Sequence, residues 1–188
     1  MFYPTYPYET ARLRLRRQSM DDLDWQFALR QIPEVIRFLP FGGESMEEMK
    51  QVMERRTSMT HWEKPGDRIM MMVENKETRE RLGEVSLFST AHEKDTGELG
   101  YIFHPNHHGK GYAREAAKEI MRIGFEEAKQ HRMTALCDPE NKASLAVMLK
   151  LGMRQEGIAK SVSFERGEWQ DLLTCAILED EWRALEVV

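Results

Sequence analysis

The sequence predicts a single mixed α/β (α+β) domain, with a mostly antiparallel central sheet of about seven strands flanked by about four helices. Segments with the short period of strands and segments with the longer period of helices follow one another in the order β-α-α-β-β-β-α-β-α-β-β. Apolar residues make up 41% of the chain and charged residues 31%, which is typical of a globular protein. No linker or repeat divides the 188 residues, so we expect one domain over residues 1–188, with an N-terminal arm at 1–9.

The opening segments predict one strand and two helices. Residues 10–17 place leucines on one face and arginines on the other, as in a half-buried strand. Ser19 can cap a first helix that runs to about residue 30. Ser45 and Glu48 have the spacing of a capping box, and they predict a second helix that reaches about residue 62.

Three strands separated by polar turns are expected next. Their predicted ranges are 68–74, 82–89 and 99–104, with a charged hairpin between the first two. Pro105 stops the third strand, since proline has no amide hydrogen to donate to a neighbour.

The remaining chain predicts two helices and three strands. Apolar and small residues recur at three- and four-residue steps and predict a long helix with one buried face, formed by Ala113, Ala116, Ala117, Ile120, Met121, Gly124 and Ala128. A strand at 132–137 follows. Asp138 and Pro139 signal a helix that ends at Gly152, a residue suited to a left-handed cap. Residues 153–158 and 169–177 are expected to close the sheet as a strand pair.

Charge and composition exclude several classes of protein. The net charge is −5 and the sequence has no long basic block, so we expect no nucleic-acid partner. No segment approaches membrane-spanning length and the N-terminus lacks the apolar core of a signal peptide, so we expect a cytoplasmic protein without a membrane partner. Cys137 and Cys175 are far apart and lie in apolar stretches, which indicates buried free thiols.

The stretch from Tyr101 to Ala116 carries the chemistry. Its order is a strand, a loop with two glycines and the start of a helix. The first amides of a helix have no partner within it and, with the helix dipole, favour an anion, to which Lys110 adds a positive charge. The glycine pattern fits neither a dinucleotide fingerprint nor a nucleotide-hydrolysing loop. Taken alone, this stretch indicates a ligand that carries phosphate.

The sequence also resembles the GNAT acetyltransferase superfamily, and within it the branch of the ribosomal-protein N-terminal (alanine/serine) acetyltransferases. The family loop, Gln/Arg-x-x-Gly-x-Gly/Ala, is similar to His108-Gly-Lys-Gly-Tyr-Ala113, although histidine replaces the usual first residue. Residues 99–105, 141–144 and 149–153 match further blocks in the family order, and residues 10–15 resemble the first strand of this branch.

This resemblance implies a sheet that is splayed in the middle to hold acetyl-CoA, the co-substrate. It implies an N-acetyltransferase that moves an acetyl group to a primary amine by direct transfer in a ternary complex. The residues expected to contact the coenzyme are Ile102, Phe103, His104, His108, Gly109, Lys110, Gly111, Tyr112, Ala113, Asn141 and Ser144. Asn141 has an alternative role as a helix cap or turn residue.

Catalysis requires a base for the amine and a donor for the leaving thiolate. Glu98 is our first choice for the base, acting through water, because family members keep a carboxylate on this strand. Glu84 on the adjacent strand is the second choice, and both glutamates have the alternative of ordinary solvent-facing positions. Met148 stands where many members have a tyrosine that protonates the thiolate, and Ser144 is the nearest substitute.

The acceptor stays open between a protein N-terminus and a small-molecule amine, in a pocket expected around residues 32–41 and 161–169. A homodimer is also left open. The cluster of His104, His107 and His108 lies in one loop without cysteine or carboxylate partners, so we expect no metal. A different class of function, a non-catalytic regulatory module that binds CoA or acyl-CoA, is the main alternative. A phosphate-binding protein of unrelated fold is a more distant one.

Overall fold

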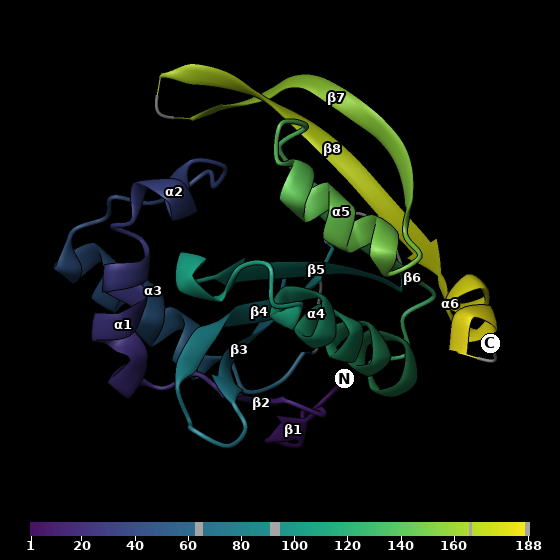
Figure 1. Cartoon of the computed structure of the whole chain (residues 1–188), viewed down its shortest axis with the longest axis horizontal. Coiled ribbons are helices and arrows are strands. Elements are labelled where there is room, and N and C mark those ends of the chain that lie inside the picture. Colours follow the sequence, from purple (N-terminus) through teal and green to yellow (C-terminus); the bar gives the residue numbers. More distant parts are fainter. Residues whose placement is uncertain (63–65, 91–94, 166, 187–188) are drawn as a thin grey trace.

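A computed structural model describes residues 1–62, 66–90, 95–165 and 167–186, and its centre is one mixed sheet (Figure 1). The strands follow the order β1-β2-β3-β4-β5-β6-β8-β7, and every neighbouring pair is antiparallel except β5 and β6. Their bounds are β1 Tyr8–Glu9, β2 Leu13–Arg17, β3 Arg68–Asn75, β4 Arg81–Ser89, β5 Thr96–Phe103, β6 Arg132–Cys137, β7 Arg154–Glu165 and β8 Glu168–Leu178.

The described helices are α1 Leu23–Leu29, α2 Pro33–Ile36, α3 Met46–Ser58, α4 Tyr112–Arg122, α5 Lys142–Lys150 and α6 Glu179–Glu186. Two short 3-10 helices, η1 Met20–Asp22 and η2 Pro105–His107, and one π-helix, η3 Ile123–Glu127, complete them. The predicted fold class is confirmed, with more elements than expected. The strand β1 has two residues and α2 has four, which is too short for a periodic pattern. The helix α6 follows β8 directly, with three acidic residues in its first turn.

The two faces of the sheet bury different layers. Leu13, Val85 and Leu99 belong to one core cluster with the predicted face of α4, including Ala116 and Ile120. Side chains on successive strand residues point to opposite faces. Glu84 and Glu98 therefore face away from α4, toward the side on which α1 and α3 pack.

The start of α3 follows from the cap that the sequence predicts, whereas α5 begins at Lys142 with Asn141 as its cap, later than the Asp138 and Pro139 signal predicted. Ser45 and Glu48 form the capping box at α3, with the Glu48 amide donating to the Ser45 hydroxyl at 3.3 Å. This helix ends at Ser58, earlier than expected. Gly152 follows α5 with a φ of 84°, which confirms the expected left-handed cap.

The N-terminal residues lie against the sheet. Glu9 pairs with Arg14, and Phe2 forms an isolated bridge with Trp62. The Phe2 amide donates to the Trp62 carbonyl at 2.7 Å. The segment expected to be an arm thus contributes strand β1, which is the edge strand of the sheet beside β2.

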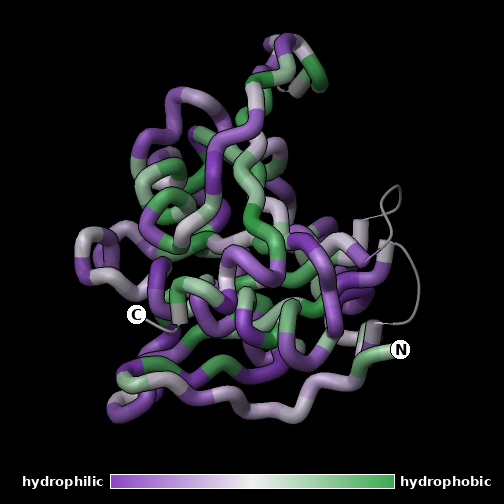
Figure 2. Tube along the Cα trace, turned by 90° about the vertical axis from the view of Figure 1, so that its right-hand side faces the viewer, coloured by the Kyte–Doolittle hydropathy of each residue, from purple (hydrophilic) through white to green (hydrophobic). Residues whose placement is uncertain are grey.

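The closing strands are longer than predicted. Pairing of β8 with β6 spans residues 173–178, and the remainder of the β7–β8 hairpin extends beyond the sheet. Figure 2 shows its tip at the top of the molecule. Ile158, Val162, Phe164 and Trp169 on this hairpin are exposed. Among the described residues, no helix is long and apolar enough to cross a membrane.

Candidate active site

The central feature of the site is a gap between β5 and β6. These parallel strands pair over only three residues of each, from Thr96 to Glu98 on β5 and from Arg132 to Thr134 on β6. Beyond Glu98, β5 keeps its pairing with β4, while β6 keeps its pairing with β8. The sheet therefore splays at Glu98, as the fold prediction expected.

Backbone groups of β5 line this gap. His104 donates its amide to Leu82 on β4, and alternation along the strand turns the Ile102 amide toward β4 as well. The amides of Tyr101 and Phe103 consequently face the gap. From the sequence we expected Ile102, Phe103 and His104 to contact the coenzyme in this gap. Of the three, only Phe103 has its amide directed into the gap by the register of β5 with β4. The Tyr101 amide takes the position expected of Ile102.

A glycine loop leads from β5 into α4. Gly109 and Gly111 have φ angles of 73° and 79°, values that residues with a Cβ rarely adopt. The first backbone bond of the helix runs from the Glu115 amide to the Gly111 carbonyl at 3.1 Å. Within the described residues, the amides of residues 109–114, which include Lys110, Tyr112 and Ala113, donate to no recorded acceptor. These open donors fit an anionic diphosphate.

Arg12 holds this loop from the other side. Its guanidinium donates to the Lys110 carbonyl at 3.0 Å and to the Glu115 carboxylate at 2.7 Å, and lies 4.6 Å from the Tyr112 ring centre. Burial would raise the pKa of Glu115, but hydrogen bonds from Thr10 and Arg12 hold it below its ordinary value. Sequence reasoning missed Arg12 because its alternation with leucine suggested only an exposed strand position.

The histidines of the loop have structural partners. The His108 side chain contacts the Phe103 carbonyl through Nε2 at 3.0 Å, and its Nδ1 lies 3.9 Å from the Glu34 carboxylate on α2. His104 accepts a bond from the Asn106 amide at 3.2 Å and so caps η2. In the part of the chain that the structure describes, no group of three or more His, Cys, Asp or Glu side chains is arranged to hold a metal.

Asn141 and Ser144 lie at the start of α5, across the gap from β5. The Asn141 side-chain oxygen accepts the Ser144 amide at 3.0 Å, so it caps the helix, and its side-chain nitrogen has no recorded acceptor among the described residues. The Ser144 hydroxyl lies 2.8 Å from the Tyr101 hydroxyl. Tyr101 begins the stretch from Tyr101 to Ala116 that the sequence analysis singled out, but nothing in the sequence predicts its contact with Ser144.

Glu98 lies where the gap opens, on the sheet face opposite α4. It pairs in register with Phe88 on β4 and with Thr134 on β6. Its side chain is half-buried, and burial raises its pKa, while the positive charge of Arg68 opposes the shift. A raised pKa brings a carboxyl group closer to the range in which it exchanges protons at neutral pH.

Glu84 has a different environment. It is 2% exposed, forms ion pairs with Arg30 and Arg56, and accepts bonds from Gln18 and Gln26, each at 2.8 Å. Burial opposes ionisation, but these arginines lower the pKa of Glu84. Its oxygens are fully engaged and its carboxylate is a weak base. The geometry therefore favours Glu98 over Glu84 for proton abstraction.

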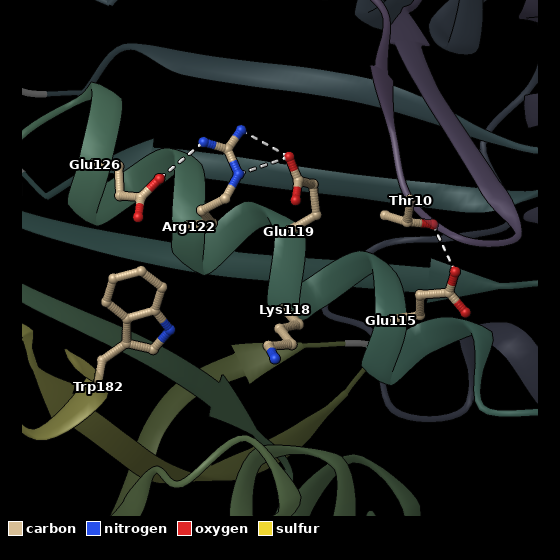
Figure 3. A pocket seen from close by; sticks show the side chains of 7 residues that line it. All are labelled: Thr10, Glu115, Lys118, Glu119, Arg122, Glu126 and Trp182. Carbon is tan, nitrogen blue, oxygen red and sulfur yellow. Dashed lines mark hydrogen bonds and ion pairs between the residues drawn. The ribbon is translucent and has the colours of Figure 1, made fainter. Parts of the chain in front are cut away.

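A separate hollow of about 250 Å³ lies along the outer side of α4, beside Trp182 of α6 (Figure 3). Its acidic side chains already have cationic or hydroxyl partners. Glu119 and Glu126 pair with Arg122, and Glu115 binds Arg12 and Thr10. This hollow does not reach Glu98 or Tyr101, so we assign the chemistry to the gap between β5 and β6.

The glycine loop, the gap and the element order match one known family. The model of the GNAT acetyltransferase domain matches residues 12–154. The chain belongs to the GNAT acetyltransferase family. The uncharacterized N-acetyltransferase YnaD of Bacillus subtilis is 32% identical over 173 residues, which cover 92% of this chain and 97% of YnaD. The putative ribosomal N-acetyltransferase YdaF of the same species is 28% identical over 53% of this chain and 55% of its own.

Solved GNAT structures confirm the fold. An acetyltransferase of the GNAT family from Bacillus anthracis superimposes with a TM-score of 0.80 at 29% identity, covering 96% of this chain and 99% of its own. A spermidine N-acetyltransferase from Vibrio cholerae, solved with CoA and spermine, has a TM-score of 0.78 at 20% identity, covering 93% and 99%. The family and the enzyme class predicted from the sequence are thus confirmed.

Proposed function

We propose that this protein transfers an acetyl group from acetyl-CoA to a primary amine by direct attack within a ternary complex. The observation that carries the proposal is the short pairing of β5 with β6. It opens a gap that has the amides of the glycine loop at one end and the carboxyl group of Glu98 at the other.

The residues of the gap fit the parts of the coenzyme. The open amides at 109–114, with Lys110, would hold the diphosphate, since backbone donors at a helix start favour an anion. The backbone of Tyr101 and Phe103 and the side-chain nitrogen of Asn141 would hydrogen-bond the amides of the pantetheine arm. The coenzyme supplies an activated acetyl thioester, and the chain orients it.

Glu98 would accept the proton of the attacking amine, through a water molecule. An alkylamine is mostly protonated at neutral pH, so a base is needed before it can attack. Glu98 and Tyr101 lie on opposite faces of the sheet, because side chains alternate along β5. The Glu98 carboxyl group faces the α1 and α3 side, and Tyr101 faces the α4 and α5 side. The amine would therefore approach from the α1 and α3 side, where α2 and the β7–β8 hairpin offer surfaces for specificity.

The names of two relatives suggest the chemical class of the acceptor. The relatives include a spermidine N(1)-acetyltransferase of Escherichia coli and a putative ribosomal N-acetyltransferase of Bacillus subtilis, and both names describe transfer of an acetyl group to nitrogen. We infer that the acceptor of this chain is a primary amine, either free or at a protein N-terminus, which Glu98 is suited to activate.

The test is thiol release from acetyl-CoA by the purified chain with a panel of polyamines, amino sugars, amino acids and N-terminal peptides, with acetylation confirmed by mass spectrometry. We expect amine-dependent turnover. Tight binding of CoA without turnover of any amine would instead support the non-catalytic module. No binding of CoA at millimolar concentration would contradict both.

A further inference from the structure

Four side chains form a row across the sheet, on the face that carries Glu98. Arg68 on β3 pairs in register with Phe88 on β4, which pairs with Glu98 on β5. Glu98 pairs in turn with Thr134 on β6. Paired residues of neighbouring strands point to the same face, so these side chains lie next to one another. Arg68 is exposed and Thr134 is buried, so the row leads from solvent to the opening of the gap.

The Arg68 side chain lies over the Phe88 ring. Its guanidinium carbon is 5.0 Å from the ring centre, a distance typical of a cation–π contact. Phe88 belongs to β4, the strand between Arg68 and Glu98. The contact therefore holds the guanidinium against the strand next to Glu98, at the exposed end of the row.

The donors of the Arg68 guanidinium are available to a ligand. Within the part of the chain that the structure describes, this group has no hydrogen-bond or ion-pair partner. Two other arginines on this side of the sheet, Arg30 and Arg56, are paired with Glu84. The charge of Arg68 also reaches Glu98, since it lowers the pKa of that carboxyl group against the stronger effect of burial.

A guanidinium with open donors beside a base suits an acceptor that carries an anionic group. Its planar fork of N–H donors matches the two oxygens of a carboxylate. An amine with a carboxylate a few bonds away can direct its nitrogen toward Glu98 and its carboxylate toward Arg68. A polyamine would instead bring a second positive charge close to Arg68, and like charges repel.

We propose, on the basis of the proposed function, that the acceptor is a primary amine that carries a carboxylate, and that Arg68 is the specificity residue that binds this carboxylate. A free amino acid and a peptide with an acidic N-terminal residue share this chemistry. The amine nitrogen forms the new bond to the acetyl carbon, the carbon–sulfur bond breaks and its electron pair stays on sulfur. The amine proton passes through water to Glu98, and Arg68 keeps its protons throughout.

The test compares kcat/KM for pairs of acceptors that differ only in the carboxylate. The common amino acids are compared with their carboxamides, and peptides that begin with aspartate or glutamate are compared with those that begin with asparagine or glutamine. We expect the carboxylate to be favoured about tenfold, mainly through KM, and spermidine to be a poorer acceptor than the favoured compound. The pair that shows the preference identifies the source of the acceptor.

Three variants test Arg68 itself. Arg68→Gln should lower the ratio within the favoured pair about tenfold, mainly through a higher KM for the carboxylate. Arg68→Lys keeps the charge and should keep most of the preference. Arg68→Glu should reverse the preference and favour spermidine. Loss of Arg68 also raises the pKa of Glu98, but this change acts on both members of a pair alike, so their ratio isolates recognition of the carboxylate.

The matched control is Arg183→Gln on α6, which should leave every ratio unchanged. Equal kcat/KM within each pair for the native protein, or a preference that survives Arg68→Gln, would overturn the role of Arg68 while leaving the proposed function intact. Absence of turnover with every amine would overturn both. Circular dichroism of each variant identifies any that does not fold.

Discussion

Arg12 and Glu115 join the segment before β2 to the first turn of α4, through a guanidinium–carboxylate contact of 2.7 Å. The same guanidinium donates to the Lys110 carbonyl and lies on the Tyr112 ring. The Arg12 side chain therefore contacts one residue of the glycine loop, Lys110, and two residues of the first turn of α4, Tyr112 and Glu115. A loop that is ordered before its ligand arrives binds that ligand more tightly, because less conformational entropy is lost on binding.

Arg12→Ala should accordingly weaken the binding of CoA about three- to tenfold, with little effect on kcat. Isothermal titration calorimetry measures the affinity directly. Arg55→Ala, an exposed arginine on α3, serves as the control for loss of one positive charge. Equal losses in both variants would indicate a general charge effect and would contradict the role of Arg12 in the loop.

Gly111→Ala tests the backbone of the loop. A Cβ at a φ of 79° costs roughly 1–2 kcal/mol, and a shift of the backbone to relieve this strain would turn the open amides away from the ligand. We expect at least a tenfold rise in the KM for acetyl-CoA. Gly66→Ala is a matched control, since its φ is 90° with no heavy atom within 4 Å of the added Cβ. It should cost similar stability and leave the KM unchanged.

Glu98→Gln tests the base. A base works only when deprotonated, so activity should fall as the pH drops through the pKa of Glu98, and burial places this pKa above the ordinary value of 4.5. The glutamine variant should lose about 100-fold or more in kcat and no longer show this acidic limb, with an unchanged affinity for CoA. Glu77→Gln, at an exposed site, is the control. A full-rate variant with the native pH profile would exclude Glu98.

Glu84→Gln should affect stability first. It leaves Arg30 and Arg56 without their carboxylate, and the loss of one partner from a buried ion pair costs about 3–5 kcal/mol. Because the folded-state pKa of Glu84 is lowered, its contribution is present above the unfolded value of 4.5 and is lost as the pH falls below it. Urea unfolding at neutral and acidic pH should show a large loss for the variant and a flatter acid dependence. A native-like unfolding midpoint would contradict this assignment.

Much of the fold could be predicted because its signals are local. The capping box of Ser45 and the left-handed cap at Gly152 each depend on residues close in the sequence. The end of the β7–β8 hairpin was harder to predict, because exposed positions such as Phe164 and Trp169 do not show the alternation of a half-buried strand. The short helix α2 has too few residues to show any period.

The candidate site likewise contains features that the sequence could predict and contacts that it could not. The glycine loop has a local pattern, and so does the Asn141 cap of α5. The contacts of Arg12 with Glu115 and of Tyr101 with Ser144 join residues 103 and 43 positions apart, and no spacing rule links them. Likewise, Glu84 and Glu98 are equivalent in the sequence, and only the arginines contributed by α1 and α3 distinguish the buried ion pair from the half-buried acid.

The three-residue pairing of β5 with β6 also has a consequence for handling the protein. It leaves an unpaired strand edge inside the sheet along residues 99–103. Unpaired edges attract other chains and promote aggregation. A coenzyme that fills the gap would cover this edge and, by mass action, would raise the thermal midpoint of the protein. Purification and storage with CoA should therefore keep the protein monodisperse for longer.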